Sequence, residues 1–165
     1  MLQFVPWRQI ADWRCTSCGS CCRSYSVVLN FPEWLRITQT FGSENTVIGL
    51  NKLFIKRSDD GNCAFLCRLG SSYLCALQSM KPKACMIWPF KLLTEPTYGE
   101  QKSALFDFAG KSLYIYADNH CNGLTYGSPS WEFSSLTLRE FARIALGCFN
   151  VQHNSTRKSN TVFRF

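Results

Sequence analysis

The chain has 165 residues, of which 46% are hydrophobic and 18% are charged, and its formal net charge is +7. This length and apolar content suffice for one ordinary domain with its own core, and they exclude a disordered chain or a small scaffold held only by disulfides. A net positive charge of this size is consistent with an acidic partner such as RNA or with a role in solubility, and it does not distinguish the two.

The chain contains ten cysteines, which require an explanation. The segment from Met1 to Arg8 has neither the basic start nor the long apolar run of a secretory signal. No stretch approaches the roughly 18 uninterrupted apolar residues that a membrane span needs. We therefore expect a cytoplasmic protein, in which clustered thiols stay reduced and serve as metal ligands or catalytic groups.

The first regular elements are predicted just after the first cysteines. Residues 25–29 favour a short strand because they are rich in β-branched side chains. Asn30 is then followed by Pro32 and Glu33, a capping-box pattern with proline in the first turn, which predicts a helix. Gly42 is expected to end it.

Two hairpins are predicted further along the chain. Residues 52–56 favour a strand, the Asp-Gly turn over 58–62 follows, and residues 63–66 are expected to return as its partner. Residues 104–108 and 113–117 form the second predicted hairpin, across Ala109-Gly110-Lys111.

The last predicted helix begins after Thr137, which forms a capping-box pattern with Glu140. Apolar residues at helical spacing continue to Phe149. On this pattern Cys148 would pack in the core. We expect residues 1–149 to form a cysteine-cluster metal-binding domain and residues 150–165 a basic C-terminal tail. The predicted class is α+β: a single small domain with short hairpins and a few helices wrapped around a cysteine-ligated metal centre.

The main chemical signal is the run Cys15-x-x-Cys18-x-x-Cys21-Cys22. Spacings of two residues let a tight loop direct several sulfurs at one point, and Gly19 inside the run allows the backbone to curl. Soft thiolates select zinc or iron–sulfur centres over hard cations. Core packing and a disulfide framework are the alternatives, and adjacent cysteines fit the first poorly because their side chains diverge.

The same run resembles the signature of the CxxCxxCC family of zinc- or iron-chelating proteins, and later blocks agree with it. These blocks are Cys63-Ala-Phe65-Leu66, Cys75-Ala-Leu77, the stretch from Lys81-Pro82 through Cys85 to Pro89-Phe90, and Cys121-Asn-Gly123. Lys81 and Met86 stand where the family usually has arginine. One branch of the family resembles the flagellin lysine methylases, whose domain is associated with an iron–sulfur cluster.

The resemblance implies eight metal ligands, carried over position by position: Cys15, Cys18, Cys21, Cys22, Cys63, Cys75, Cys85 and Cys121. Cys67 lies outside the pattern, and the sequence does not decide its role. The all-sulfur ligand set and the methylase branch favour an iron–sulfur cluster of the 4Fe-4S type, with zinc as the alternative. His120 is a ligand beside Cys121, a hydrogen-bond donor that supports a ligand, or an ordinary surface residue, and we expect the last.

Three functions remain open. The first is an iron–sulfur protein that serves as an accessory, electron-transfer or assembly subunit of a larger complex. The second is a structural zinc protein that binds RNA or a ribonucleoprotein particle. The third is an enzyme subunit, although the sequence shows no nucleophile–base pair, no glycine-rich phosphate loop and no cysteine spacing of the radical type.

Overall fold

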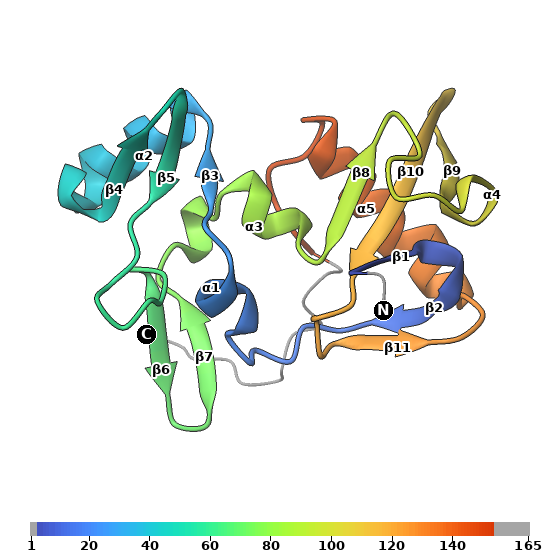
Figure 1. Ribbon diagram of the computed structural model, residues 1–165, viewed down its shortest axis with the longest axis horizontal. Coiled ribbons are helices and arrows are strands. Elements are labelled where there is room, and N and C mark those ends of the chain that lie inside the picture. The colour runs from blue at the N-terminus through green and yellow to red at the C-terminus, as the bar shows by residue number, and fades with distance from the viewer. Residues whose placement is uncertain (1–2, 154–165) are drawn as a thin grey trace. The chain divides into compact units, whose positions relative to one another are not determined.

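The computed structural model describes residues 3–153, and its contacts divide into two compact units (Figure 1). The first unit contains the residues up to Thr16 and those from Pro89 onward, and the second is Ser17–Trp88. Each unit combines short helices with antiparallel strands. The predicted α+β class is therefore confirmed.

The first unit is built on β10 (Lys111–Asp118), its longest strand, which has antiparallel neighbours along both edges. These neighbours are β1 (Phe4–Pro6), β8 (Phe90–Leu93) and β9 (Leu105–Phe108). The hairpin of β9 and β10 confirms the prediction for this segment. Ala109 and Gly110 both have positive φ, 50° and 74°, as a two-residue type I′ turn requires.

Around this sheet lie a two-stranded ribbon and several helices (Figure 1). They are η1 (Trp7–Gln9), β2 (Ile10–Trp13), α4 (Gln101–Ala104), β11 (Leu124–Tyr126), the π-helical η4 (Phe133–Thr137) and α5 (Leu138–Ala145). Aromatic rings fill the core between them: Phe90 lies 4.7 Å from Phe141 and 5.8 Å from both Trp13 and Phe133, measured between ring centroids. These ring contacts join the end of β2 and the start of β8 to η4 and α5.

The last helix, α5, follows Thr137 as predicted, but the predicted capping box does not form. Thr137 has helical φ and ψ and makes no side-chain capping hydrogen bond, because the helical backbone continues into it from η4. The capping-box residues are present, but the chain before them never leaves the helical region.

The second unit contains a three-stranded sheet in the order β3 (Val28–Leu29), β5 (Lys52–Ile55) and β4 (Thr46–Gly49), with α2 (Phe31–Phe41) beside it. A separate ribbon pairs β6 (Leu66–Leu69) with β7 (Ser72–Cys75). Short helices complete the unit: α1 (Ser20–Ser24), η2 (Ser43–Asn45), η3 (Gln78–Met80) and α3 (Lys83–Ile87).

The helix predicted after Asn30 is confirmed in detail. The Asn30 side chain accepts a hydrogen bond from the Glu33 backbone N–H at 2.9 Å, and the Glu33 carboxylate accepts one from the Asn30 backbone N–H at 2.9 Å. Gly42 is the C-cap, with φ of 92°. Glu33 also accepts a hydrogen bond from the backbone N–H of Lys83 at 2.7 Å, which ties α2 to the start of α3.

Two strand predictions in this unit need correction. The strand expected over residues 25–29 is limited to β3. The strand expected to return over residues 63–66 is absent from the described residues, where only an isolated bridge joins Arg57 to Cys63. Leu66 instead begins β6, whose partner β7 lies later in the sequence.

The second unit has a small core of its own, made by Leu29, Ile37, Ile55, Cys63, Phe65 and Leu77. Cys22 and Cys75 pack against it. Cysteine side chains thus form part of the packing that holds this unit together. Among the helices of residues 3–153, none combines the length and the apolar character needed to cross a membrane.

Candidate metal centre

The CxxCxxCC run makes a tight turn into α1, the helix that carries Cys21 and Cys22 (Figure 1). Gly19 is its N-cap, with φ of 70°, and the Gly19 carbonyl accepts a hydrogen bond from the Cys22 backbone N–H at 3.0 Å. A Cβ at this position would lie 2.9 Å from the ring of Tyr73 in β7. Gly19 is therefore required both for the curl, as predicted, and for the close approach of β7.

Three further predicted ligands belong to the same unit. The backbone N–H of Cys63 donates to the Cys22 carbonyl at 2.8 Å, Cys75 is the last residue of β7, and Cys85 lies in α3. Cysteines from four separate segments therefore belong to one compact unit, and Cys22 and Cys75 pack against the core that contains Cys63.

Arg57 connects two of these segments through the main chain. Its guanidinium donates to the carbonyl of Arg23 in α1, to that of Tyr25 just after α1, and to that of Gly61 in the turn before Cys63. The Tyr25 bond is 2.7 Å long. No sequence pattern indicates this role, because Arg57 binds backbone oxygens, which every residue carries.

Cys21 and Cys22 interact directly, with their Sγ atoms 3.9 Å apart. A hydrogen bond from the Cys22 thiol lowers the pKa of Cys21 to about 6, burial opposes this shift, and the positive charge of Lys81 adds to it. The same hydrogen bond, burial and repulsion from Cys21 raise the pKa of Cys22. The pair therefore favours a state with one thiolate and one thiol.

The other three cysteines resist ionisation. Burial is the main cause that raises the pKa of Cys63, Cys75 and Cys85, and charge repulsion among these sulfurs and from Cys21 adds to it. Lys81 opposes the rise at Cys75 and Cys85. Several thiolates can form together here only if a cation compensates their charge, which is the electrostatic condition of a thiolate-bound metal.

The remaining predicted ligands in the first unit are Cys15 and Cys121. The Trp13 indole N–H donates to the Cys121 Sγ at 3.4 Å. The Arg14 backbone N–H donates to the Gly123 carbonyl at 2.9 Å, which brings the residues just before Cys15 beside those just after Cys121. A Cβ on Gly123 would lie 2.1 Å from the Arg14 carbonyl oxygen, so glycine in the Cys121-x-Gly123 block permits this approach.

The last three cysteines occupy more open positions. Cys18 is half-buried and its Sγ donates to the Ser20 hydroxyl at 3.3 Å. Cys67 is exposed on β6. Cys148 is exposed as well, so its expected place in the core is wrong: α5 ends at Ala145, and the apolar face does not extend to Cys148.

All ten cysteines lie in the part of the chain that the structure describes, and they carry thiols rather than disulfides. Within residues 3–153, no three or more His, Cys, Asp or Glu side chains are already arranged to hold a metal ion. The eight-residue ligand set therefore stays a prediction.

A family model described as "Putative zinc- or iron-chelating domain" matches residues 14–122. The chain belongs to the CxxCxxCC family. This confirms the resemblance seen in the sequence and supports a metal-binding cysteine cluster that takes zinc or iron. No curated protein and no solved structure matches this CxxCxxCC protein.

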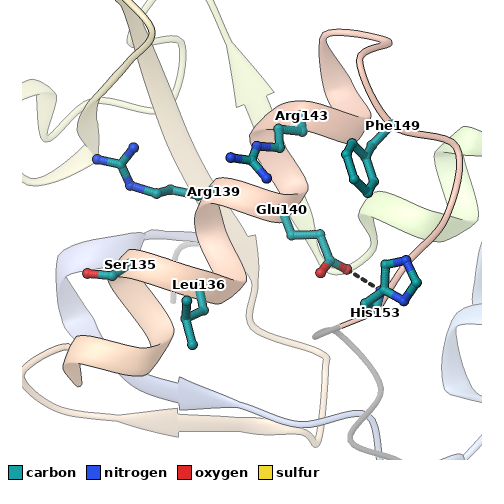
Figure 2. A pocket seen from close by; sticks show the side chains of 7 residues that line it. All are labelled: Ser135, Leu136, Arg139, Glu140, Arg143, Phe149 and His153. Atoms are coloured by element: carbon teal, nitrogen blue, oxygen red, sulfur yellow. Dashed lines mark hydrogen bonds between the residues drawn. The ribbon is translucent and has the colours of Figure 1, made fainter.

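A cavity of about 250 Å³ lies along η4 and α5 (Figure 2). Its lining residues are Ser135, Leu136, Arg139, Glu140, Arg143, Phe149 and His153. The buried Glu140 accepts a hydrogen bond from the His153 backbone N–H at 2.6 Å. Two exposed arginines one helical turn apart make the rim of this cavity basic.

Proposed function

We propose that this CxxCxxCC protein holds an iron–sulfur cluster of the 4Fe-4S type and serves, in the cytoplasm, as an accessory, electron-transfer or assembly subunit of a larger complex. The observation that carries the proposal is the gathering of Cys21, Cys22, Cys63, Cys75 and Cys85 in the second unit, where their charges act on one another. A cluster of this type takes four cysteine thiolates.

The donor set of the second unit fits such a cluster. Both histidines of the chain, His120 and His153, lie outside Ser17–Trp88, so sulfur is the only soft donor there. Zinc sites often mix cysteine with histidine, so a ligand set of sulfur alone favours the iron–sulfur cluster over zinc. The surrounding cations also fit, because Lys81 favours the thiolates of Cys21 and Cys75.

When bound, the cluster would supply one-electron transfer, and the role of the protein would be to fix its potential. Lys81 and Arg57 lower the pKa values of nearby cysteines, so their positive charge would favour the reduced, more negative state. Burial of Cys63 beside Phe65 and Leu77 keeps water from one side of the site.

The test begins with protein purified without oxygen. We expect a brown protein that bleaches reversibly on reduction, with iron and acid-labile sulfide in equal amounts. The Cys85→Ser variant should lose the colour, whereas Cys67→Ser, which removes an exposed cysteine of the same unit, should keep it. A colourless protein with stoichiometric zinc would overturn the cluster, and an unchanged Cys85→Ser protein would remove Cys85 from the ligand set.

The second candidate is a structural zinc protein that binds RNA or a ribonucleoprotein particle. It is favoured by the basic rim of the α5 cavity, where Arg143 lies 5.8 Å from the ring centroid of the exposed Phe149. Arginine beside an exposed aromatic ring suits phosphate and base contacts. This function predicts RNA binding that weakens steeply with salt and that Arg139→Gln with Arg143→Gln reduces.

A further inference from the structure

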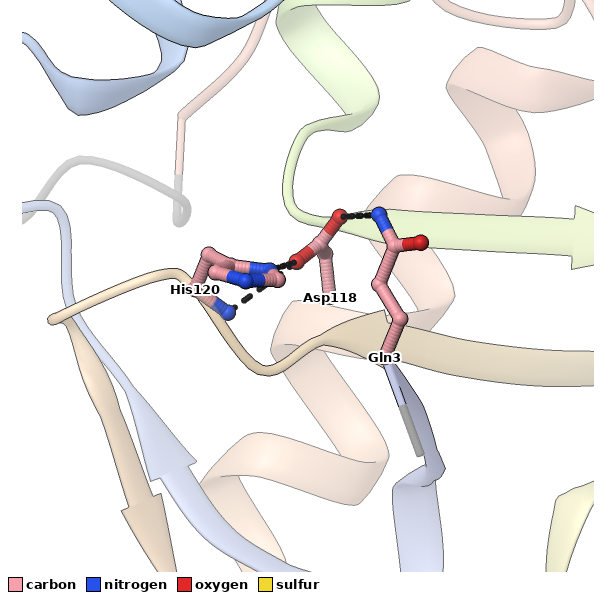
Figure 3. Close-up of polar contacts among 3 residues, drawn as sticks. All are labelled: Gln3, Asp118 and His120. Atoms are coloured by element: carbon pink, nitrogen blue, oxygen red, sulfur yellow. Dashed lines mark hydrogen bonds and ion pairs between the residues drawn. The ribbon is translucent and has the colours of Figure 1, made fainter. Parts of the chain in front are cut away.

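His120 belongs to a hydrogen-bonded pair in the first unit (Figure 3). Its Nδ1 lies 2.8 Å from Oδ1 of Asp118, the last residue of β10. The Asp118 side chain is 1% exposed and the His120 side chain 66% exposed. A buried carboxylate thus holds the inner edge of an imidazole whose outer edge faces solvent.

Asp118 is held from several sides. Its Oδ1 also accepts the His120 backbone N–H at 3.0 Å, and its Oδ2 accepts the side-chain N–H of Gln3 at 3.2 Å. A carboxylate that accepts several donors stays ionised and can only accept. In the tautomer that donates Nδ1–H to this carboxylate, Nε2 is the ring nitrogen with the lone pair, and it lies on the edge away from Asp118.

The turn that carries this ring is fixed by the backbone. The Asn119 N–H donates to the Gln3 carbonyl at 2.9 Å, and the Cys121 N–H donates to the Asp118 carbonyl at 3.1 Å. His120 and the predicted ligand Cys121 are therefore consecutive on one ordered turn. The Cys121 sulfur accepts the Trp13 indole N–H at 3.4 Å.

A surface ion pair is the simpler explanation of the same contact. Such a pair stabilises a protein little and does not require a buried carboxylate, whose removal from water is costly. Metal-bound histidines, in contrast, characteristically donate their second ring N–H to a carboxylate, which fixes the tautomer and the ring orientation. Asp118, His120 and Cys121 together match that arrangement.

We propose that His120 contributes Nε2 as a nitrogen ligand to the metal that Cys121 binds, with Asp118 as the positioning residue. The proposal rests on the proposed metal-binding function and adds to it a donor outside the cysteine pattern of the family. In an iron–sulfur cluster a nitrogen ligand in place of sulfur raises the reduction potential. In a zinc site it completes a mixed nitrogen and sulfur set.

The test is X-ray absorption at the edge of the metal that the full-length protein carries when purified without oxygen. We expect a nitrogen neighbour at ligand distance in the wild-type protein. His120→Gln should lose that neighbour, while His153→Gln, which removes the only other histidine, should keep it. Asp118→Asn should keep the nitrogen and weaken metal affinity about 10- to 100-fold.

The metal content measured on the same samples separates two kinds of failure. If the wild-type protein binds metal through sulfur alone, or if His120→Gln leaves the nitrogen signal unchanged, the role of His120 is refuted and the metal-binding function stands. If the wild-type protein takes up no metal, both fail. Because His120 is exposed, its replacement is not expected to unfold the protein, and Asp118→Asn is not needed for the decision.

Discussion

The backbone N–H of Cys63 donates to the carbonyl oxygen of Cys22 at 2.8 Å. Two predicted ligands that lie 41 positions apart, at 22 and 63, are therefore joined through the main chain without any metal. The hydrogen bonds of Arg57 to the carbonyls of Arg23, Tyr25 and Gly61 reinforce the same junction. The arrangement of cysteines around α1 is thus partly set by the polypeptide, and its supports can be tested individually.

Replacing Arg57 by Met should loosen this junction. The substitution removes the charged donor to these carbonyls, and one such hydrogen bond contributes about 2 kcal/mol. We expect a loss of about 2–3 kcal/mol in the free energy of unfolding, measured by urea denaturation, together with faster metal release to a chelator.

Arg68→Met is the matched control for that experiment. Arg68 also donates to a carbonyl, that of Gly70 at 3.2 Å, but within the exposed turn between β6 and β7. We expect its loss to cost less than about 0.5 kcal/mol. Equal effects of the two substitutions would contradict a special role for Arg57.

Comparing Gly19→Ala with Gly70→Ala separates the cost of backbone strain from the cost of steric contact with a neighbouring side chain. Both glycines have positive φ, 70° and 60°, but only a Cβ at Gly19 would meet the Tyr73 ring, at 2.9 Å. Alanine in this conformation costs about 1 kcal/mol at either position. Gly19→Ala should lose a further 1–3 kcal/mol or so, because Tyr73 has to move, and should take up less metal. Thermal unfolding of both variants measures the difference, and equal losses would show that Tyr73 yields without cost.

The features that the sequence predicted correctly are those fixed by neighbours along the chain. Asn30 and Glu33 cap α2 within one turn, and Ala109-Gly110 closes the β9–β10 hairpin. The return strand over residues 63–66 was predicted wrongly because Leu66 pairs with Cys75 instead, and a local pattern does not decide between such partners.

The same distinction applies to the site. The spacing of Cys21 and Cys22 indicated their chemistry, and the family blocks indicated Cys63, Cys75 and Cys85. The hydrogen bonds of Arg57 to the carbonyls beside these cysteines depend on the tertiary fold, so no local motif predicted them. Asp118 was missed for the same reason: its hydrogen bond to Gln3 joins residues 115 positions apart.

Removing the metal should affect the second unit first. Its buried apolar core consists of Leu29, Ile37, Ile55, Cys63, Phe65 and Leu77, whereas the first unit buries many more side chains around β10. A core this small gains much of its stability from bound metal. Hydrogen exchange after chelation should accelerate in Ser17–Trp88, while β8 and β10 stay protected. Uniform acceleration in both units would contradict this.

The turn before Cys63 should make stability depend on pH through Asp60. The Asp60 carboxylate accepts hydrogen bonds from the Ser58 hydroxyl at 2.5 Å, and from the Asn62 backbone and side-chain N–H groups at 3.1 and 2.5 Å. These bonds, that of Ser58 foremost, lower the pKa of Asp60 below its ordinary value. The folded state therefore binds a proton at Asp60 less readily than the unfolded state does.

The sign of the effect follows from this lowered pKa. The stabilisation is complete above the unfolded-state pKa of about 3.9 and is lost as the pH falls through the lower folded-state pKa. Asp60→Asn should therefore be less stable than wild type at pH 7, and the difference should shrink as the pH falls below that unfolded-state pKa in urea denaturation.

Asp59→Asn, which removes the same charge one residue earlier, is the control. Because metal loss in acid affects all these proteins, the differences between them isolate the turn, and an identical pH dependence for Asp59→Asn would assign the effect to net charge instead.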